Sequence, residues 1–340
     1  MGATIHDVAR RAGVSVGTVS NVTNNKGRVS PRTRAKVEQA IRELAYRPNR
    51  AARALSIQRT FTLAYLVPDV TNPVFAKILE CAMDRARERG YTVVVFGTRG
   101  SPGVAKECVQ HVIELRVDAV LMALSHELAD PALVEALRSR GIAVVGVAGS
   151  TPVPGIDCFM WEEEEAGYCL AKYLLRAGHR GILFVGPRGS NSAMQRMAGI
   201  ARALAESERG GAGEDVCLEA DGYSARDAYT TVQNAVIRGK IGAATALVTF
   251  NDIFTSGALA ALWDQGIMVP RDLSLATFGK LHTEFSRPRI TSMVFDEEVV
   301  TARAVQRLID RVEGKYDGPP VCERFSLMLS VQESTRVQAG

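Results

Sequence analysis

Basic side chains that could bind a polyanion are concentrated in residues 1–60. This segment holds 12 lysines and arginines against three acidic residues, whereas the whole chain has 41 basic and 37 acidic residues and a net charge of +4. Residues 61–340 therefore carry a net charge of −5. Cations in such a segment favour contact with the phosphates of a nucleic acid, because each neutralised phosphate releases counterions. A solvated basic face without a partner is the alternative interpretation.

The same segment has the spacing of a helix-turn-helix motif. Thr4 can cap a first helix, Gly13 allows a tight turn, and Ser15 can cap a second helix. Apolar residues at helical spacing are expected to form the inner faces of the two helices: Ile5, Val8, Ala9, Ala12, Val19 and Val22. Four residues of the second helix are left outward or toward the major groove of DNA: Val16, Gly17, Ser20 and Asn21. The motif therefore predicts a DNA-binding head.

Two further helices are expected after this motif. Ser30-Pro31 begins a third helix that runs to about Leu44, because a cap followed by proline is typical of a helix start. After a break, Asn49 can cap a short helix over residues 50–56. In that helix Leu55 is an apolar residue among arginines, which suits insertion into the minor groove of DNA. The alternative is that Leu55 packs on the body of the protein.

Beyond Arg59, short apolar runs rich in β-branched residues alternate with amphipathic helices. Eight strands are expected in two groups: 62–67, 92–96, 119–122 and 143–147, then 181–185, 216–219, 246–250 and 273–278. Helices between them are expected over residues 74–89, 104–115, 131–140, 166–177, 193–206, 224–238 and 253–265. This alternation implies right-handed βαβ units, so the α/β body is expected to form two doubly wound, parallel-sheet lobes. Ligands of such folds bind beyond the carboxyl ends of the strands.

Length and composition exclude several classes. A chain of 340 residues is expected to hold more than one domain. It has no run of about 18 uncharged apolar residues, as a membrane span would need, and His6 and Asp7 lie where a signal peptide would be apolar. A cytoplasmic, nucleoid-associated protein is therefore expected. The cysteines show no CxxC spacing, so buried reduced thiols are expected, with no metal site or cofactor: Cys81, Cys108, Cys158, Cys169, Cys217 and Cys322.

An enzyme and a solute-binding protein are the competing classes. The chain has no GxSxG, HExxH or Walker motif, so it is not expected to be an enzyme. Gly97-x-x-Gly100 and Gly210-Gly211-x-Gly213 fit turns better than phosphate loops, and His179 fits a helix-end role better than catalysis. A solute-binding protein would share the body, but it would need a signal peptide and would lack residues 1–56.

Motifs in both the head and the body carry a family resemblance. In the head they are Thr4-Ile5-x-Asp7-Val8-Ala9-x-x-Ala12-Gly13-Val14-Ser15-x-x-Thr18-Val19-Ser20, Val29-Ser30-x-x-Thr33-Arg34-x-Lys36-Val37 and Leu44-x-Tyr46-x-Pro48-Asn49. In the body they are residues 177–180, 196–199, 250–252, 269–274 and 290–292. These motifs resemble the lactose repressor/galactose repressor (LacI/GalR) family of bacterial transcription regulators over nearly the whole chain. The resemblance implies a repressor that binds a pseudo-palindromic operator as a homodimer, or as a dimer of dimers, and senses a small-molecule effector through a periplasmic-binding-protein-like body.

The resemblance assigns DNA contacts to particular residues. The short helix pairs with its twin in the minor groove, where Leu55 wedges into the central base step and Ala52 permits close approach. Val16 and Gly17 occupy positions that commonly read base edges, although neither side chain can donate a hydrogen bond. Asn21 stands where many members have arginine, and asparagine favours adenine over guanine. Ser15, Thr18 and Asn25 are expected on phosphates, and the other expected contacts are Thr4, Ser20, Arg28, Asn49, Arg50 and Arg53.

The resemblance also places an effector cleft between the two lobes. Arg196 aligns with an arginine that often holds effector hydroxyls or carboxylates, but Gly279-Lys280 and Ala148-Gly149 stand where acidic residues are common. Arg196 with Lys280 favours an acidic or phosphorylated ligand, and aromatic residues are expected beside them. The other expected pocket residues are Asp69, Asn72, Phe75, Trp161, Tyr223, Asn251, Asp252 and Phe295. Two alternatives stay open: the aromatics form lobe-interface core, or the cleft is degenerate and the protein represses without an effector.

The expected domain boundaries follow from these assignments. They are 1–47 for the helix-turn-helix domain, 48–59 for the hinge helix and linker, and 60–340 for the effector-binding and dimerisation domain. The amino-terminal lobe is expected over about 60–159 and 290–318, and the carboxy-terminal lobe over about 162–288 and 320–332. Ligand is expected to rotate the lobes about chain crossings near residues 158–162, 286–290 and 316–322, and so to change operator affinity, as inducer or corepressor. Glu162–Glu165 is expected to be a solvated helix N-terminus.

Overall fold

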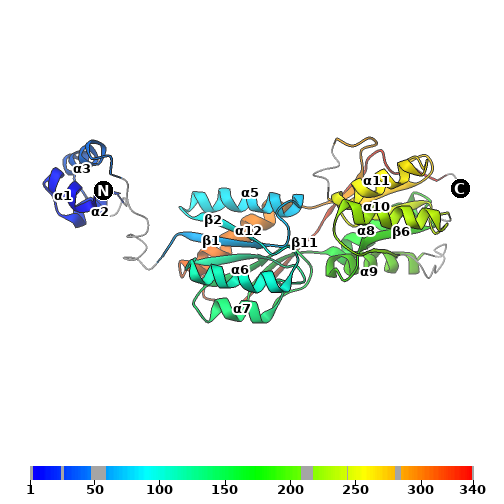
Figure 1. Cartoon of the computed structure of the whole chain (residues 1–340), viewed down its shortest axis with the longest axis horizontal. Helices are drawn as coiled ribbons and strands as arrows, with labels where there is room; N and C mark the ends of the chain where they lie inside the picture. Colours follow the sequence, from blue (N-terminus) through cyan, green and yellow to red (C-terminus); the bar gives the residue numbers. More distant parts are fainter. Residues whose placement is uncertain are drawn as a thin grey trace. The chain divides into compact units, whose positions relative to one another are not determined.

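The computed structural model describes residues 3–23, 27–46, 59–207, 217–242, 244–279 and 285–338. The chain divides into two compact units, Met1–Phe61 and Thr62–Gly340. The first unit is a small helical head and the second is a larger α/β body, with elements coloured along the sequence in Figure 1. No helix in the described ranges is long and apolar enough to cross a membrane.

Local capping signals build the head. Its described helices are α1 (Ile5–Ala12), α2 (Val16–Thr23) and α3 (Pro31–Glu43). Thr4 begins α1 with a capping box: the amide of Asp7 donates to Thr4 Oγ1 over 3.3 Å, and the amide of Thr4 donates to the Asp7 carboxylate over 3.0 Å. Gly13 ends α1 with a φ of 68°, a left-handed conformation that glycine adopts without strain. The turn at Gly13 leads directly into α2, as the spacing predicts.

A small apolar core holds the three head helices together. Val8, Val19 and Val37, one from each helix, are all 0% exposed. Three more of the predicted inner-face residues are buried in the same cluster: Ala9, Ala12 and Val22. Ile5 is only partly buried. Burial of one such side chain stabilises a fold by about 1.5–3 kcal/mol. Because Val19 and Val22 of α2 are buried in this core, the opposite face of α2 remains exposed.

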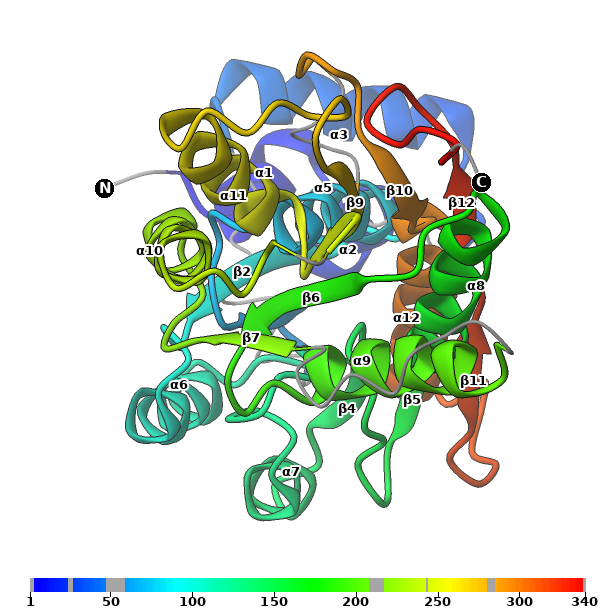
Figure 2. The ribbon, with the colours of Figure 1, turned by 90° about the vertical axis from the view of Figure 1, so that its right-hand side faces the viewer.

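Two six-stranded sheets form the described body, each with helices on both faces (Figures 1 and 2). The first sheet is entirely parallel and has the order β11-β5-β4-β3-β1-β2. Its strands are β1 (Thr62–Val67), β2 (Thr92–Gly97), β3 (Ala119–Ala123), β4 (Ala143–Val147), β5 (Asp157–Trp161) and β11 (Cys322–Phe325). Its helices are α5 (Pro73–Glu88), α6 (Pro102–Glu114), α7 (Pro131–Arg138) and α12 (Glu297–Val312).

The second sheet has the order β12-β10-β9-β8-β6-β7 and is parallel except for the pairing of β12 with β10. Its strands are β6 (Ile182–Pro187), β7 (Cys217–Ala220), β8 (Ala246–Thr249), β9 (Ser274–Phe278), β10 (Thr291–Val294) and β12 (Met328–Ser330). Its helices are α8 (Glu163–Arg176), α9 (Asn191–Ala205), α10 (Ala225–Ile237) and α11 (Asp252–Asp264). The two doubly wound lobes agree with the predicted fold class.

Local sequence signals explain why the predicted starts of α5, α6 and α7 lie close to the observed ones. Asn72, Ser101 and Asp130 each cap a helix whose first residue is proline, so α5, α6 and α7 begin at sharp signals. The strands of the first sheet are covered on both faces and therefore read as nearly continuous apolar runs. Every residue of β3 is buried, for example.

The lobe assignment near the carboxyl terminus is a correction. Residues 290–318 are expected in the first lobe and 320–332 in the second, but β10 pairs in the second sheet and β11 pairs in the first. The chain therefore crosses between the lobes after β10 and after β11, later than predicted in both cases. Strands of three or four residues carry too little periodicity to assign them to a sheet, because pairing partners distant in sequence decide the assignment.

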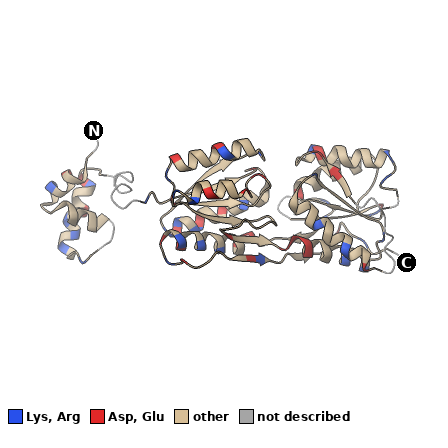
Figure 3. Cartoon of the chain, turned by 90° about the horizontal axis from the view of Figure 1, so that it is seen from below, with Lys and Arg blue, Asp and Glu red and all other residues tan. Residues whose placement is uncertain are grey.

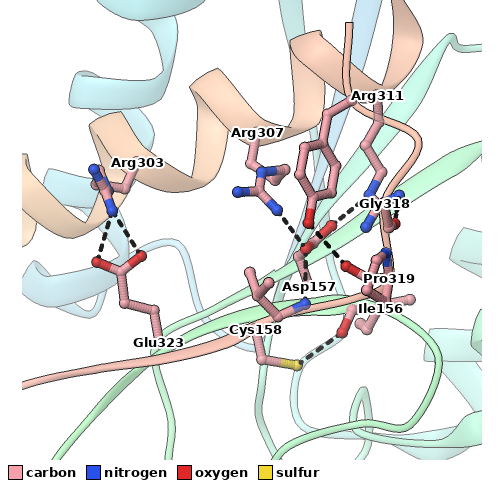
Figure 4. A network of polar contacts seen from close by, with 11 residues as sticks. Ile156, Asp157, Cys158, Arg303, Arg307, Arg311, Gly318, Pro319 and Glu323 are labelled. Carbon is pink, nitrogen blue, oxygen red and sulfur yellow. Dashed lines mark hydrogen bonds and ion pairs between the residues drawn. The ribbon is translucent and has the colours of Figure 1, made fainter. Parts of the chain in front are cut away.

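A buried carboxylate fastens α12 to the first sheet (Figure 4). Asp157 on β5 is 0% exposed; it accepts a hydrogen bond from Arg307 Nη1 at 2.9 Å and another from Arg311 Nε. The amide of Val321 donates to the same carboxylate over 3.0 Å. The Tyr316 ring lies 3.7 Å from the Arg307 guanidinium and 4.8 Å from that of Arg311. Several donors therefore satisfy one buried charge and position the segment that leads into β11.

His179 has a structural role that differs from the predicted helix-end role. Its ring is 1% exposed, with Nε2 donating to the carbonyl of Arg336 at 3.0 Å and Nδ1 lying 3.1 Å from Thr245 Oγ1. Burial lowers the pKa of His179, which favours the neutral ring. The ring thus holds the carboxy-terminal segment against the second lobe, where Ser334 Oγ also donates to the Leu275 carbonyl at 2.5 Å.

The prediction of uniformly buried thiols is wrong. All six cysteines are free, but Cys169 and Cys322 are exposed, while Cys81 and Cys217 are half-buried. Cys169 lies on the outer face of α8, and Cys322 lies on the edge strand β11. Residue type alone could not predict these exposures. Exposure depends on which face of a helix is covered and on which strand forms the edge of a sheet.

Candidate functional site

The exposed face of α2 is the candidate surface of the head. Gly17 and Asn21 are exposed, as expected for residues that point away from the core. Val16 is a partial correction, since it is half-buried and packs against the head core. Ser15 Oγ accepts from the amide of Thr18 over 3.1 Å and lies 2.9 Å from Thr18 Oγ1, so this pair caps the helix while Ser15 stays exposed. The exposed part of this face is therefore formed by Ser15, Gly17 and Asn21.

Basic residues are spread over the described part of the head (Figure 3), and some of them form ion pairs within it. Arg11 pairs with Glu43 at 2.6 Å and Arg10 pairs with Asp7. Among the described residues of the head, the side chains of four exposed cations form no hydrogen bond or ion pair: Arg28, Arg32, Lys36 and Arg42. They are therefore available for an anionic partner. The predicted contacts Thr4 and Ser20 lie on this unit, Thr4 as the cap of α1 and Ser20 half-buried on α2.

Several predicted site residues lie outside the described residues. In the head and linker they are Asn25, Asn49, Arg50, Ala52, Arg53 and Leu55, and in the body it is Lys280. The expected short helix over residues 50–56 falls in the same range.

The carboxyl end of β1 supplies residues with local roles. Asp69 is exposed, and its Oδ1 accepts from the amide and the hydroxyl of Thr71 at 2.8 and 2.7 Å. Asn72 caps α5 by accepting from the amide of Val74 at 3.1 Å. Phe75 is half-buried on α5. These predicted pocket residues therefore lie together at one strand end, where two of them also stabilise the turn into α5.

Polar residues that the sequence analysis missed follow the next strands of the first sheet. Thr98 follows β2, and its hydroxyl donates to Glu127 Oε1 over 2.6 Å. Glu127 lies in the turn after β3 and is only 6% exposed. The hydroxyls of Ser125, after β3, and Ser150, after β4, are buried and have no hydrogen-bond partner within the described structure. The rule that ligands bind beyond carboxyl strand ends could have found all four.

The second lobe places Arg196 in a role different from the one predicted. Its guanidinium, 5% exposed, forms a bidentate pair with Glu163, with Nε and Nη2 donating over 2.7 and 2.8 Å. Its Nη1 donates to the carbonyl of Phe250. Rings from the ends of three neighbouring strands surround the cation, with centroids 4.8, 4.5 and 5.5 Å away: Phe250, Phe278 and Phe295. The charge of Arg196 is therefore already balanced inside the lobe.

This ion pair depends on close contact between α8 and α9. A Cβ atom on Gly167 would lie 2.1 Å from the Arg196 carbonyl oxygen, and one on Gly199 would lie 1.9 Å from that of Glu164. Glycine at both positions is therefore required for the approach that brings Arg196 to Glu163.

The expected solvated acidic run at the start of α8 needs correction at one position. Glu163 is 2% exposed and forms the buried pair, whereas Glu164 and Glu165 are solvated partners of Arg202 at 2.7 and 2.6 Å. Glu162 accepts from the Ser326 hydroxyl at a chain crossing. Consecutive helical residues point to different faces, so one acid of the run meets the core.

Residues after β7 and β8 lie at the carboxyl-end edge of the second sheet. Asn251 caps α11 by accepting from the amide of Phe254 at 3.0 Å, and Asp252 is 3% exposed. Tyr223 is half-exposed and packs edge-on against Phe250 at 6.3 Å. Partial burial raises the pKa of Tyr223, and the charge of Glu127 on the first lobe raises it further. Gln195 also donates to the Ser150 carbonyl over 3.3 Å, so polar residues of the two lobes meet here.

Aromatic residues meet where the chain crosses between lobes. Trp161 ends β5, Phe295 follows β10 and Phe325 ends β11. The Trp161 ring centroid is 4.9 Å from that of Phe295 and 6.5 Å from that of Phe325. Trp161 is 2% and Phe295 6% exposed. These two predicted pocket aromatics therefore form the packed core of the crossings, which is the alternative role considered for them.

Family comparisons match both units. The model described as "Bacterial regulatory proteins, lacI family" matches residues 4–49, and "Periplasmic binding proteins and sugar binding domain of LacI family" matches residues 60–315. The chain is 30% identical over 296 residues to the HTH-type transcriptional regulator DegA of Bacillus subtilis (strain 168), covering 86% of each chain. It is 30% identical over 325 residues to the HTH-type transcriptional repressor PurR of Edwardsiella ictaluri (strain 93-146), covering 94% of each.

Solved structures show the same fold. A transcriptional regulator CelR–cellobiose complex has a TM-score of 0.72 at 27% identity, covering 98% of this chain and 99% of that one. The lac repressor dimer bound to operator and the anti-inducer ONPF has a TM-score of 0.86 at 24% identity, covering 99% and 100%.

Substitution of Arg196 tests its structural role. Arg196→Met is expected to lower the free energy of unfolding by about 3–5 kcal/mol, because Glu163 is left as an unpaired buried charge. The double variant Glu163→Leu/Arg196→Met should recover much of that loss. Urea unfolding measures both effects. Arg188→Met is the control, because exposed Arg188 pairs with Glu219 and should contribute less than about 1 kcal/mol. Unchanged stability of Arg196→Met would contradict the assignment.

Proposed function

The chain belongs to the lacI family of bacterial regulatory proteins and is a DNA-binding transcriptional regulator, and we propose that it represses transcription from a pseudo-palindromic operator. Repressors of this family bind DNA operators as dimers and respond to small-molecule effectors. The proposed assembly is a homodimer, with a tetramer as a further possibility, acting on the chromosome in the cytoplasm. The head distinguishes this function from that of a solute-binding protein.

One observation carries the proposal: a folded head presents the exposed side of α2 together with exposed cations that have no partner among the described residues. Gly17 and Asn21 point outward, and Val16 is anchored to the core. In a helix-turn-helix, this part of the second helix lies against base edges in the major groove. We assign direct base reading to Asn21 and apolar contact with a thymine methyl to the exposed part of Val16. Exposed cations such as Arg28 then contact phosphates.

Binding to the operator should depend steeply on salt. A mobility-shift assay with genomic fragments should isolate a specific site, whose log affinity falls linearly with log salt concentration. Arg28→Ala should reduce that slope by about 1 and weaken binding similarly for all sequences. Arg188→Ala, a charge change on the body, is the matched control and should leave the slope unchanged. The absence of any specific shift would refute the proposed function.

Asn21 should determine one half-site base. Asn21→Arg is expected to move the preference from adenine toward guanine, by about 1–3 kcal/mol, because arginine forms a bidentate pair with guanine. Selection from a degenerate operator library measures the preference. Asn234→Arg adds the same charge at an exposed position on α10 and should leave it unchanged. Identical profiles for the wild type and Asn21→Arg would show that Asn21 does not read a base.

We place the effector at the facing strand ends of the two lobes. Arg196 is neutralised by Glu163, so it gives little support to the acidic or phosphorylated ligand predicted from sequence. The Glu127 carboxylate and the buried hydroxyls of Ser125 and Ser150 instead favour a ligand that carries hydroxyl or amino groups. Tyr223 offers an aromatic face beside them. An effector-insensitive repressor with a degenerate cleft is the second candidate.

Regulation would act through the three chain crossings. Ligand held between the strand ends would change the relative rotation of the lobes about the cluster of Trp161, Phe295 and Phe325. In a dimer, that rotation would move the two first lobes and alter the pairing of the linkers that carry Leu55. A ligand that binds the two arrangements with different affinity necessarily changes operator affinity by the same coupling free energy.

A thermal-shift screen tests the proposed ligand class. The panel contains sugars, amino sugars and nucleosides, each beside its phosphorylated counterpart. An unphosphorylated member should raise Tm by about 5 °C at about 100-fold excess over Kd. Glu127→Gln should abolish that rise, whereas exposed Glu219→Gln should preserve it. A rise only with phosphorylated members would overturn the class, and no rise with any member would favour the effector-insensitive candidate.

A further inference from the structure

Two cysteines are register partners on neighbouring strands of the first sheet. Cys158 on β5 pairs with Cys322 on β11, and the amide of Cys158 donates to the Val321 carbonyl over 2.8 Å. Neighbouring strands lie about 4.7–4.9 Å apart, which is within the Cα separation of about 4.4–6.8 Å found in disulfides. The backbone therefore already holds the Cα atoms of the two cysteines at a separation that a disulfide can span.

Both thiols lie on the same face of the sheet. Glu323, the residue after Cys322, faces α12 and forms an ion pair with Arg303 at 3.0 Å, and Asp157, the residue before Cys158, binds α12 as well (Figure 4). Because side chains alternate along a strand, Cys158 and Cys322 share the opposite face. The Cys158 thiol now points to the carbonyls of Val153 and Ile156, at 3.8 and 3.7 Å.

The two thiols differ in access to solvent. Cys322 is exposed on an edge strand, whereas Cys158 is 1% exposed. Burial raises the pKa of Cys158 to about 11, so its thiol is protonated at neutral pH. An oxidant in solution therefore reaches Cys322 first, and Cys158 is protected until a mixed disulfide forms beside it.

We propose that Cys158 and Cys322 form a reversible disulfide that links the thiol redox state of the cell to the lobe crossing. The Cys322 thiolate attacks a small-molecule disulfide, forming a mixed disulfide and releasing one thiol. Cys158 then loses its proton, turns from the two carbonyls and attacks Cys322 Sγ, which releases the second thiol. The protein thiols lose two electrons and two protons, and the small disulfide gains them.

The position of this pair explains why oxidation would affect regulation. β5 and β11 lead into two of the three crossings, and the amide of Glu162 donates to the Phe325 carbonyl over 3.0 Å where they leave the sheet. A covalent bond between the strands would stiffen this hinge, whose movement is part of the proposed function. Regulation by the disulfide therefore rests on that function, whereas the chemistry of the pair does not.

Treatment of the full chain with oxidised glutathione tests the pair. Peptide mass spectrometry under non-reducing conditions should find the Cys158 and Cys322 peptides joined, with the loss of two hydrogens, and dithiothreitol should restore both thiols. Cys322→Ser and Cys158→Ser should each abolish the link. Substitution of the buried Cys158 could also disturb folding, so the exposed Cys322 variant decides the result. Cys169→Ser removes another exposed thiol and should preserve the link. Glutathione bound to wild-type Cys322 without the intramolecular link would overturn the proposal.

The regulatory part has its own measurement. In a mobility-shift assay, oxidation should change operator affinity, or its response to effector, by about fivefold or more in wild type and not in Cys322→Ser. A disulfide that forms without this change would refute the link to the hinge. A reduced wild type that shows no specific shift would instead refute the proposed function, while the mass spectrum still decides the chemistry of the pair.

Discussion

The buried guanidinium of Arg196 is the interaction on which the second lobe depends. Its charge is tolerated in the interior because Glu163 pairs with it through two hydrogen bonds and Phe250 supplies a carbonyl acceptor. Glycines at 167 and 199 let α8 and α9 approach closely enough for the pair to form. One cation therefore joins two helices to the ends of β8, β9 and β10.

This arrangement links the carboxyl ends of the second-sheet strands to the chain crossings. Phe295 lies against the Arg196 guanidinium on one side and packs with Trp161 on the other. Trp161 in turn contacts Phe325, at the end of the strand that carries Cys322. A change in rotation between the lobes must therefore be accommodated by a few packed aromatic rings, and packed groups of this kind favour discrete arrangements over continuous deformation.

Much of the fold could be predicted because its signals are local. The capping box at Thr4, the turn at Gly13 and the prolines that begin α5, α6 and α7 act within one helical turn. The placement of β10 and β11 could not be predicted, since strands of four residues carry little periodicity and their pairing with strands distant in the sequence decides their sheet. For the candidate site, the strand ends were predicted, but Glu127 was missed and Arg196 was assigned to a ligand instead of to Glu163.

The sequence by itself determined the helix-turn-helix head, the concentration of positive charge around it and the alternation of strands and helices in the body. These properties follow from spacing and composition, which act over a few residues. Only the tertiary structure decided which charges remain available, which thiols are exposed and where the lobes are joined. Glu163 and Arg196 are 33 residues apart, and Cys158 and Cys322 are register partners on β5 and the edge strand β11. Contacts over such separations depend on packing, which no local pattern specifies.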